Sequence, residues 1–203
     1  MKRRTIEFMG IKLVVNEYVY EPSDDTELLA KAVIRNIKPF SKALEIGTGS
    51  GAIAILLAKL GCDVTATDIN PKAIEVAKEN ATQNNVKIRF IVGDLFAGLN
   101  EKFDTIVFNP PYLPEDDFDF LLDHYDKMSV VGGKKGNETI IRFLKDLPRY
   151  LRPNGEAYIV LSSLSKPEEV FEIIRKQGLN YEILESKSFF FERIMVVKCF
   201  KQR

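Results

Sequence analysis

Residues 44–52 read LEIGTGSGA and decide the fold that we predict for this chain of 203 residues. The stretch places glycines between an apolar run typical of a strand, residues 43–46, and one typical of a helix, residues 51–60. Glycine at such a turn lets the backbone bend sharply and lets a ligand approach the chain closely. Asp68 follows the next predicted strand, residues 64–67, where its carboxylate can accept hydrogen bonds from both hydroxyls of a ribose. The sequence therefore predicts a nucleoside-binding site at the carboxyl ends of parallel strands.

Strands and helices alternate along the rest of the chain, which predicts an α/β fold with a parallel sheet covered by helices on both faces. Before the alternation begins we expect a short hairpin at residues 6–15 and a helix around residues 28–37. No helical pattern separates the last two strands, which we therefore expect to pair antiparallel. The remaining expected strands are residues 86–92, 105–108, 157–161, 181–186 and 193–200, with a turn at 153–155, and the remaining expected helices are residues 71–83, 137–149 and 167–176.

The identity of the nucleoside has to be decided by further residues, because Gly47, Gly49 and Ala52 also satisfy the dinucleotide pattern G-x-G-x-x-G/A. Glu45, two positions before the first glycine, suits a ligand that carries an ammonium and a sulfonium better than one that carries a pyrophosphate. Asp94, after the third strand, is placed to accept a hydrogen bond from the exocyclic amine of adenine. Both acidic residues favour S-adenosylmethionine over a nicotinamide dinucleotide.

Residues 108–112, FNPPY, follow the fourth strand of the predicted sheet. The prolines remove backbone donors and stiffen the loop, so the side-chain oxygen of Asn109 and the carbonyl of Pro110 can be held as fixed acceptors. A planar NH2 group offers one hydrogen to each acceptor, and its nitrogen is a poor nucleophile because its lone pair is delocalised. Two acceptors favour the pyramidal, partly positive nitrogen of the transition state, and Tyr112 would pack against the planar group. The loop therefore predicts N-methylation of an amide or an aromatic amine.

We assign no chemistry to the histidine or the cysteines. A methylated amide sheds its proton easily, so no general base is needed, and His124 is predicted to be a loop residue. Cys62 and Cys199 lie far apart and lack the paired spacing of a zinc site. We therefore predict two buried thiols and no metal site.

The composition fits one domain over residues 1–203, with the hairpin and first helix in residues 1–40 and the catalytic sheet in residues 41–203. The 29 basic and 29 acidic residues balance, which argues against a protein whose whole surface binds nucleic acid. The longest run without a charge, residues 46–58, is too short to cross a membrane, and Glu7 interrupts the apolar stretch that a signal peptide requires. We expect a cytoplasmic protein.

Together the glycine loop, Asp68, Asp94 and the NPPY stretch resemble class I methyltransferases that act on planar nitrogens. This resemblance implies a Rossmann-like, seven-stranded, mostly parallel sheet with an antiparallel C-terminal hairpin and helices on both faces. More narrowly, residues 19–26, VYEPSDDT, resemble the HemK-type glutamine methyltransferases of translation release factors, in particular their short archaeal and eukaryotic branch. The glycines within residues 132–136 match a second glycine block of that family.

The resemblance implies an enzyme that transfers a methyl group from S-adenosylmethionine to the glutamine side-chain amide in the GGQ loop of a release factor, leaving S-adenosylhomocysteine. It implies that Asn109, Pro110, Pro111 and Tyr112 hold the substrate, and that all of these except Pro111 are catalytic. The implied cofactor contacts are Thr26, Glu45, Gly47, Gly49, Asp68, Ile69, Asp94, Leu95 and Asn109.

The chain departs from the bacterial members of that family, because only about 40 residues precede the glycine loop, too few for their N-terminal helical domain. Members of the short branch work with a small zinc-binding activator subunit, which the resemblance implies as a partner. If the strands follow the usual class I order, residues 86–92 lie at the sheet edge and can pair with a strand of that partner. Asn137 stands where relatives often show arginine, which leaves that contact open.

The alternative that the residues leave open is a nucleic-acid methyltransferase acting on adenine N6 or guanine N2. NPPY-like loops bind any planar NH2 group, and flipped bases present one. The zero net charge argues against this alternative, and so do residues 115–126, which contain six acidic residues and no basic one and would repel phosphates. The sequence therefore favours glutamine methylation.

Overall fold

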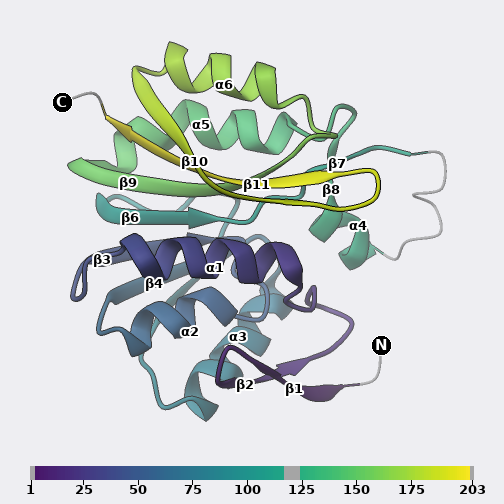
Figure 1. Cartoon of the computed structure of the whole chain (residues 1–203). Coiled ribbons are helices and arrows are strands. Elements are labelled where there is room, and N and C mark those ends of the chain that lie inside the picture. The colour runs from purple at the N-terminus through teal and green to yellow at the C-terminus, as the bar shows by residue number, and fades with distance from the viewer. Residues whose placement is uncertain (1–2, 117–123, 202–203) are drawn as a thin grey trace.

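A seven-stranded sheet lies between two layers of helices (Figure 1). The structure is a computed structural model that describes residues 3–116 and 124–201. The strand order is β10-β11-β9-β6-β3-β4-β5. Strand β11 runs antiparallel to both of its neighbours, whereas the pairs among β9, β6, β3, β4 and β5 are parallel. This arrangement confirms the predicted fold class. The strands are β3 (Lys42–Ile46), β4 (Asp63–Asp68), β5 (Arg89–Val92), β6 (Phe103–Phe108), β9 (Leu151–Ser162), β10 (Leu179–Ser188) and β11 (Arg193–Lys201).

The helices cover both faces of the sheet because the strands are apolar on both sides. Leu44 packs into one hydrophobic core and its neighbour Ala43 into the other, as the alternation of side chains along a strand requires. One face is covered by α1 (Asp24–Asn36), α2 (Ala52–Lys59) and α3 (Pro71–Gln83), and the other by α5 (Glu138–Tyr150) and α6 (Pro167–Lys176). Cys62 and Cys199 are both buried free thiols, as predicted.

Several expected boundaries were wrong. Strand β5 begins at Arg89 rather than at residue 86, because Val86 N still donates to Ala81 O and closes the end of α3. The expected turn at residues 153–155 lies within β9, where the pairing with β6 shifts register. His124 is not a loop residue, because it begins the helix α4 (His124–Val130). Two short strands, β7 (Leu113–Pro114) and β8 (Val131–Gly133), were not predicted and pair with each other.

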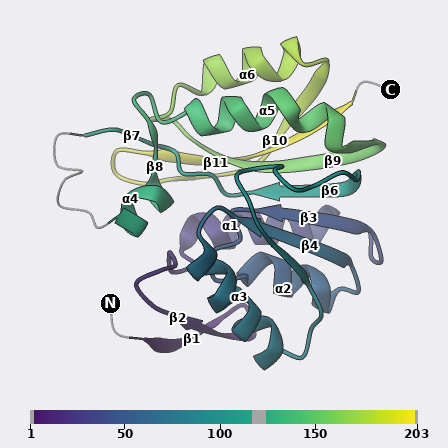
Figure 2. The same ribbon diagram turned by 180° about the vertical axis from the view of Figure 1, so that it is seen from behind.

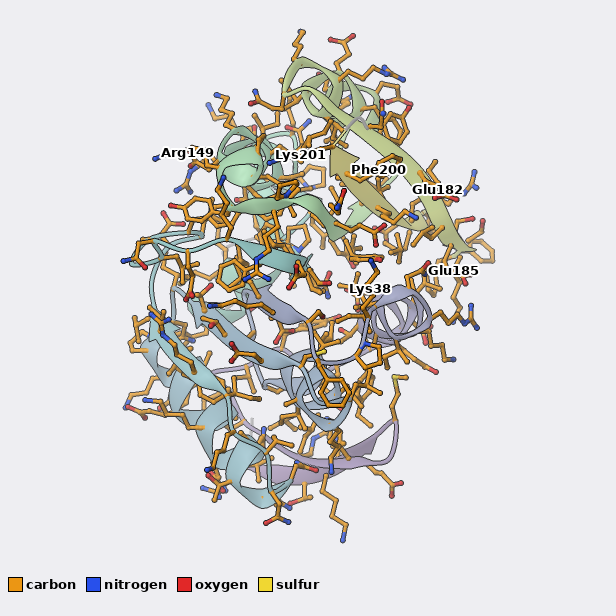
Figure 3. All side chains as sticks on the ribbon, turned by 90° about the vertical axis from the view of Figure 1, so that its left-hand side faces the viewer. Lys38, Arg149, Glu182, Glu185, Phe200 and Lys201 are labelled. Atoms are coloured by element: carbon orange, nitrogen blue, oxygen red, sulfur yellow. The ribbon has the colours of Figure 1, made fainter. Side chains whose placement is uncertain are left out.

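Residues 117–123, which carry part of the acidic segment noted in the sequence, lie outside the described residues. No helix among the described residues is long and apolar enough to cross a membrane. Figure 3 looks at the amino ends of the parallel strands, where side chains such as Lys38 and Lys201 mark the end of the sheet that lies opposite the glycine loop.

The predicted hairpin is formed by β1 (Arg4–Phe8) and β2 (Ile11–Val15), which lie beside α3 (Figure 2). A buried amide joins this hairpin to the rest of the fold. The side chain of Asn80 accepts from Val14 N at 2.7 Å and donates to Val14 O and to Ser50 O, both at 2.9 Å. Because Ser50 lies in the glycine loop, Asn80 connects the hairpin, α3 and that loop.

We predict that Asn80→Ala destabilises the chain by about 2–4 kcal/mol, because it leaves buried backbone groups without hydrogen-bond partners. Asn84 is a matched control. It makes the same pair of contacts with Lys12 one helical turn further along, on a more exposed part of the hairpin. Asn84→Ala should therefore cost less than about 1 kcal/mol. Urea unfolding of both variants measures the difference, and equal losses of stability would contradict the assignment.

Candidate active site

One cavity of about 530 Å³ opens at the carboxyl ends of the parallel strands, within the size range of small-molecule sites. It collects every site residue predicted from the sequence, which come from the turns after β3, β4, β5 and β6 and from the start of α1. These residues are Thr26, Glu45, Gly47, Gly49, Asp68, Ile69, Asp94, Leu95, Asn109, Pro110, Pro111 and Tyr112.

The glycine loop and Asp68 are fixed to each other. One carboxylate oxygen of Asp68 accepts from Gly49 N and the other from Asn70 N, both at 2.9 Å. Burial raises the pKa of Asp68, and these backbone hydrogen bonds oppose the increase. Each oxygen keeps a second lone pair, so the carboxylate can still accept hydrogen bonds from a ligand.

Glu45 has a second role that the sequence did not indicate. One of its oxygens accepts from the Thr48 hydroxyl and from Ala54 N, which joins the end of β3 to the first turn of α2. The side chain is buried, and this burial raises the pKa of its carboxyl to about 8, with a smaller contribution from the charge of Asp68. Glu45 therefore holds the glycine loop in shape as well as lining the cavity.

The rim beyond Asp68 combines apolar and charged groups. Ile69 is 54% exposed on this rim, although it is a large apolar side chain. Leu95 has a φ of 51°, a strained backbone conformation for a residue with a β-carbon. The carboxylate of Asp94 accepts from Arg142, a cavity residue of α5 that sequence reasoning missed. The predicted adenine acceptor is thus already in contact with a cation.

Asp25 is the principal residue that the sequence did not single out. One oxygen of its buried carboxylate accepts from Asn109 Nδ2 at 3.2 Å and from the Tyr112 hydroxyl at 3.0 Å. Its other oxygen accepts from the Ser23 hydroxyl and from the backbone and hydroxyl of Thr26. The first turn of α1 therefore binds both polar side chains of the NPPY loop. An acidic residue in a first helical turn is ordinary, so no sequence signal separated Asp25 from Asp24.

These contacts fix the orientation of the Asn109 amide. A carboxylate is only an acceptor, so the NH2 end of Asn109 must face Asp25. Its carbonyl end, Oδ1, is buried and has no hydrogen-bond partner among the residues that the structure describes. An unpaired buried acceptor is costly in a native structure and indicates a ligand donor. Burial and the charge of Asp25 also raise the pKa of Tyr112, which keeps the hydroxyl protonated as a donor.

The second glycine block packs directly on the backbone of the NPPY loop. A β-carbon at Gly132 would lie 2.5 Å from Pro111 O, and one at Gly136 would lie 2.4 Å from Tyr112 O. Only glycine fits at these two positions without moving the loop. The block therefore supports the backbone of the loop by close packing.

Glu192 is a further cavity residue without a sequence signal. It lies in the turn between β10 and β11, and its Oε1 is buried without a hydrogen-bond partner in the described part of the chain. Burial is the main cause of the raised pKa values of Tyr20 and Tyr112, and the charge of Glu192 adds to both. Glu192 therefore lies near Tyr20 and Tyr112 in the lining of the cavity.

Comparison with known proteins identifies relatives over most of the chain. The family described as methyltransferase small domain matches residues 21–124. A putative protein N5-glutamine methyltransferase of Methanocaldococcus jannaschii is 42% identical, over 97% of this chain and 98% of its own length. Methyltransferase HEMK2 of Homo sapiens is 34% identical, over 89% of this chain and 88% of its own length. The release factor glutamine methyltransferase of Streptococcus pneumoniae is 33% identical, over 94% of this chain and 71% of its own length.

Solved structures share the fold. The E. cuniculi Mtq2–Trm112 complex, described as responsible for methylating the translation termination factor eRF1, aligns with a TM-score of 0.74 at 28% identity. That alignment covers 92% of this chain and 100% of the other. The Thermus thermophilus 16S rRNA methyltransferase RsmC aligns with a TM-score of 0.72 at 18% identity, over 99% of this chain and 50% of its own, which shows the fold alone.

The pKa of Glu45 predicts how stability changes with pH. Burial raises it from 4.5 to about 8, so the folded chain binds this proton more tightly than the unfolded chain does. The resulting stabilisation is complete below the unfolded value and is lost as the pH rises through about 8. Glu45→Gln keeps an acceptor for Thr48 and Ala54 but cannot ionise.

We therefore expect the wild type to lose stability relative to Glu45→Gln between about pH 4.5 and pH 8, with no further loss at higher pH. Urea unfolding of both proteins without cofactor measures this change. The variant serves as the reference for all other titrating groups. An unchanged difference in stability across that range would contradict the prediction.

Proposed function

This chain belongs to the methyltransferase small domain family and, within it, to the HemK-type glutamine methyltransferases, and from that premise we propose that it methylates the side-chain amide of a protein glutamine. The observation that carries the proposal is the unpaired Oδ1 of Asn109, held in the cavity by Asp25. This oxygen accepts one hydrogen of the substrate NH2 group, and the carbonyl of Pro110 accepts the other.

The residues of this chain act by position and by hydrogen bonding. A glutamine amide nitrogen is a weak nucleophile because its lone pair is shared with the carbonyl. Two acceptors on its hydrogens favour the pyramidal nitrogen that develops as the bond to the methyl group forms. Tyr112 packs against the amide plane, and Pro111 stiffens the loop. Asp25 is a positioning residue, because it acts through Asn109 and Tyr112.

The proposed cofactor is S-adenosylmethionine, which supplies an electrophilic methyl group and leaves as S-adenosylhomocysteine. The cavity fits it in size and in charge, since Glu45, Asp68 and Asp94 all line the wall near the glycine loop. Asp68 would bind the ribose hydroxyls, and Ile69 and Leu95 would contact the adenine beside Asp94. Thr26, Gly47, Gly49 and Asn109 would complete the cofactor contacts.

The proposed substrate is the glutamine of the GGQ loop of a translation release factor. The names of the relatives support this substrate, and so does the charge of the cavity. Among the described lining residues Arg142 is the only lysine or arginine, and it is paired with Asp94. A nucleic-acid backbone would find no free cation there, which disfavours adenine N6 or guanine N2 as the acceptor.

The proposed partner is a small zinc-binding activator subunit that adds a strand to β5. Strand β5 forms one edge of the sheet and pairs only with β4 among the described residues. Val92, its last residue, is 53% exposed. An edge strand with an exposed apolar residue is suited to pairing with another chain. The Mtq2–Trm112 complex, a solved assembly of a relative with a second protein, supports the proposal.

Asn109→Ala should lower kcat by about 10²-fold or more and change cofactor affinity less, because it removes an acceptor of the transition state. The assay incubates the chain with labelled S-adenosylmethionine and either release factor or total RNA and DNA. Normal turnover by the variant would refute the acceptor role. Label in nucleic acid rather than protein would overturn the proposed substrate.

Asp25→Asn should also lower kcat by about 10²-fold, because its NH2 group would meet the donors of Asn109 and Tyr112 and turn the Asn109 amide around. Cofactor affinity and melting temperature should stay close to those of the wild type. Asp24→Asn is the matched control, since Asp24 is exposed and paired with Lys187 at the surface. Equal kcat values for the two variants would exclude positioning by Asp25.

We expect the chain purified alone to have low activity or solubility and to gain both when co-expressed with the activator subunit, because the partner covers the β5 edge. Methyl transfer to the release factor, measured at equal enzyme concentrations, tests this expectation. Full activity of the isolated chain, equal to that of the complex, would contradict it.

A further inference from the structure

The turn between β10 and β11 exposes two adjacent aromatic side chains. Phe190 is 96% exposed and Phe191 is 86% exposed, and their rings lie edge to face with centroids 5.2 Å apart. Isolated apolar side chains at a surface are common, but two neighbouring phenylalanines that contact almost nothing else form an apolar patch at a loop tip. The fold of the described chain does not require either ring.

Hydrogen bonds and an ion pair fix the conformation of the turn. Phe189 N donates to Glu192 O at 2.7 Å and closes the turn. Arg193 N donates to the Ser163 hydroxyl, and Ser163 N donates to Arg193 O, both at 2.9 Å. Lys187 binds Asp24 at the start of α1. Phe190 and Phe191 therefore project from an ordered support, so that little conformational entropy is lost when they bind a partner.

The turn lies at the mouth of the catalytic cavity. Glu192, the residue after Phe191, lines that cavity, and its buried Oε1 finds no hydrogen-bond partner within residues 3–116 and 124–201. Figures 1 and 2 both show the β10–β11 turn at the end of the sheet that carries α4, β7 and β8. A protein that inserts a glutamine into the cavity must therefore bring the surface around that glutamine to this turn.

We propose that Phe190 and Phe191 dock the methyl-acceptor protein by packing against an apolar surface next to its glutamine loop. This inference rests on the proposed function and extends it to the choice of substrate. The position of the turn favours the acceptor over the activator, because β10 and β5 form opposite edges of the sheet. The acceptor protein needs such a contact to be selected, since the cavity itself reaches only the glutamine side chain and its immediate neighbours.

The test compares the double variant Phe190→Ser/Phe191→Ser with Phe40→Ser. Phe40 is a matched control, because it is 84% exposed but precedes β3 at the opposite end of the sheet. Methylation is measured on the whole release factor and on a short peptide that contains only its glutamine loop. The binding of the release factor is measured separately by calorimetry.

For the double variant we expect KM and Kd for the whole release factor to rise at least about tenfold, as the loss of two buried aromatic contacts implies. Its kcat, its cofactor affinity and its kinetics on the peptide should not change. Phe40→Ser should behave as the wild type in all assays. A peptide is too short to reach the turn, so this contrast separates docking from damage to the cavity.

Other results overturn the proposal. Unchanged KM and Kd for the release factor would do so, and so would an equal loss of activity on the peptide. A wild-type dimer that the double variant dissociates would assign the patch to a second copy, and lost co-purification with the activator would assign it to that subunit. If the wild type binds the release factor through this turn but methylates nothing, the proposed function fails and the docking site stands. If the wild type does not bind the release factor, the docking site is wrong.

Discussion

The hydrogen bonds between Asp25 and the NPPY loop are the interaction on which the rest of the site depends. They join the first turn of α1 to the end of β6, two segments far apart in sequence. Because Asp25 accepts from Asn109 and from Tyr112 with the same oxygen, the two side chains are fixed relative to each other. Their arrangement leaves Oδ1 of Asn109 as a buried acceptor without a donor among the described residues. Such an acceptor is costly, and in the proposed function a substrate NH2 group would supply the missing hydrogen.

Two acidic side chains near the glycine loop also have both a structural role and a place in the cavity lining. Glu45 and Asp68 each use part of their carboxylate to hold the loop around residues 44–52 in shape. Both side chains also line the cavity, where their remaining oxygen lone pairs can accept hydrogen bonds. The parallel sheet makes this possible, because the ends of β3, β4, β5 and β6 all reach one edge of the molecule. Backbone donors at these ends fix the acidic side chains, and the proposed cationic cofactor would compensate for their burial.

The sequence predicted the elements and residues that depend on local pattern. The alternation of apolar residues gave the sheet and its helices, and the motifs after each strand gave the lining of the cavity. It did not predict Asp25, Asn80 or Glu192, because each acts through contacts with distant parts of the chain. An aspartate in a first helical turn and an asparagine in mid-helix look like ordinary surface residues until the tertiary partners are known. The short strands β7 and β8 were missed for the same reason, since glycines 132 and 136 are placed by the NPPY backbone rather than by local propensity.

The two proposed protein-binding surfaces lie at opposite edges of the sheet. The catalytic cavity lies at the centre of one end, so it can select a planar NH2 group but not the protein that carries it. Strand β5 offers unpaired backbone groups at one edge, and the β10–β11 turn offers aromatic side chains at the other. Because these edges lie on opposite sides of the cavity, an activator on β5 and an acceptor protein at the turn can bind at the same time without competing. In the proposed ternary assembly the activator would cover the β5 edge, while the mouth of the cavity would stay open to the acceptor protein.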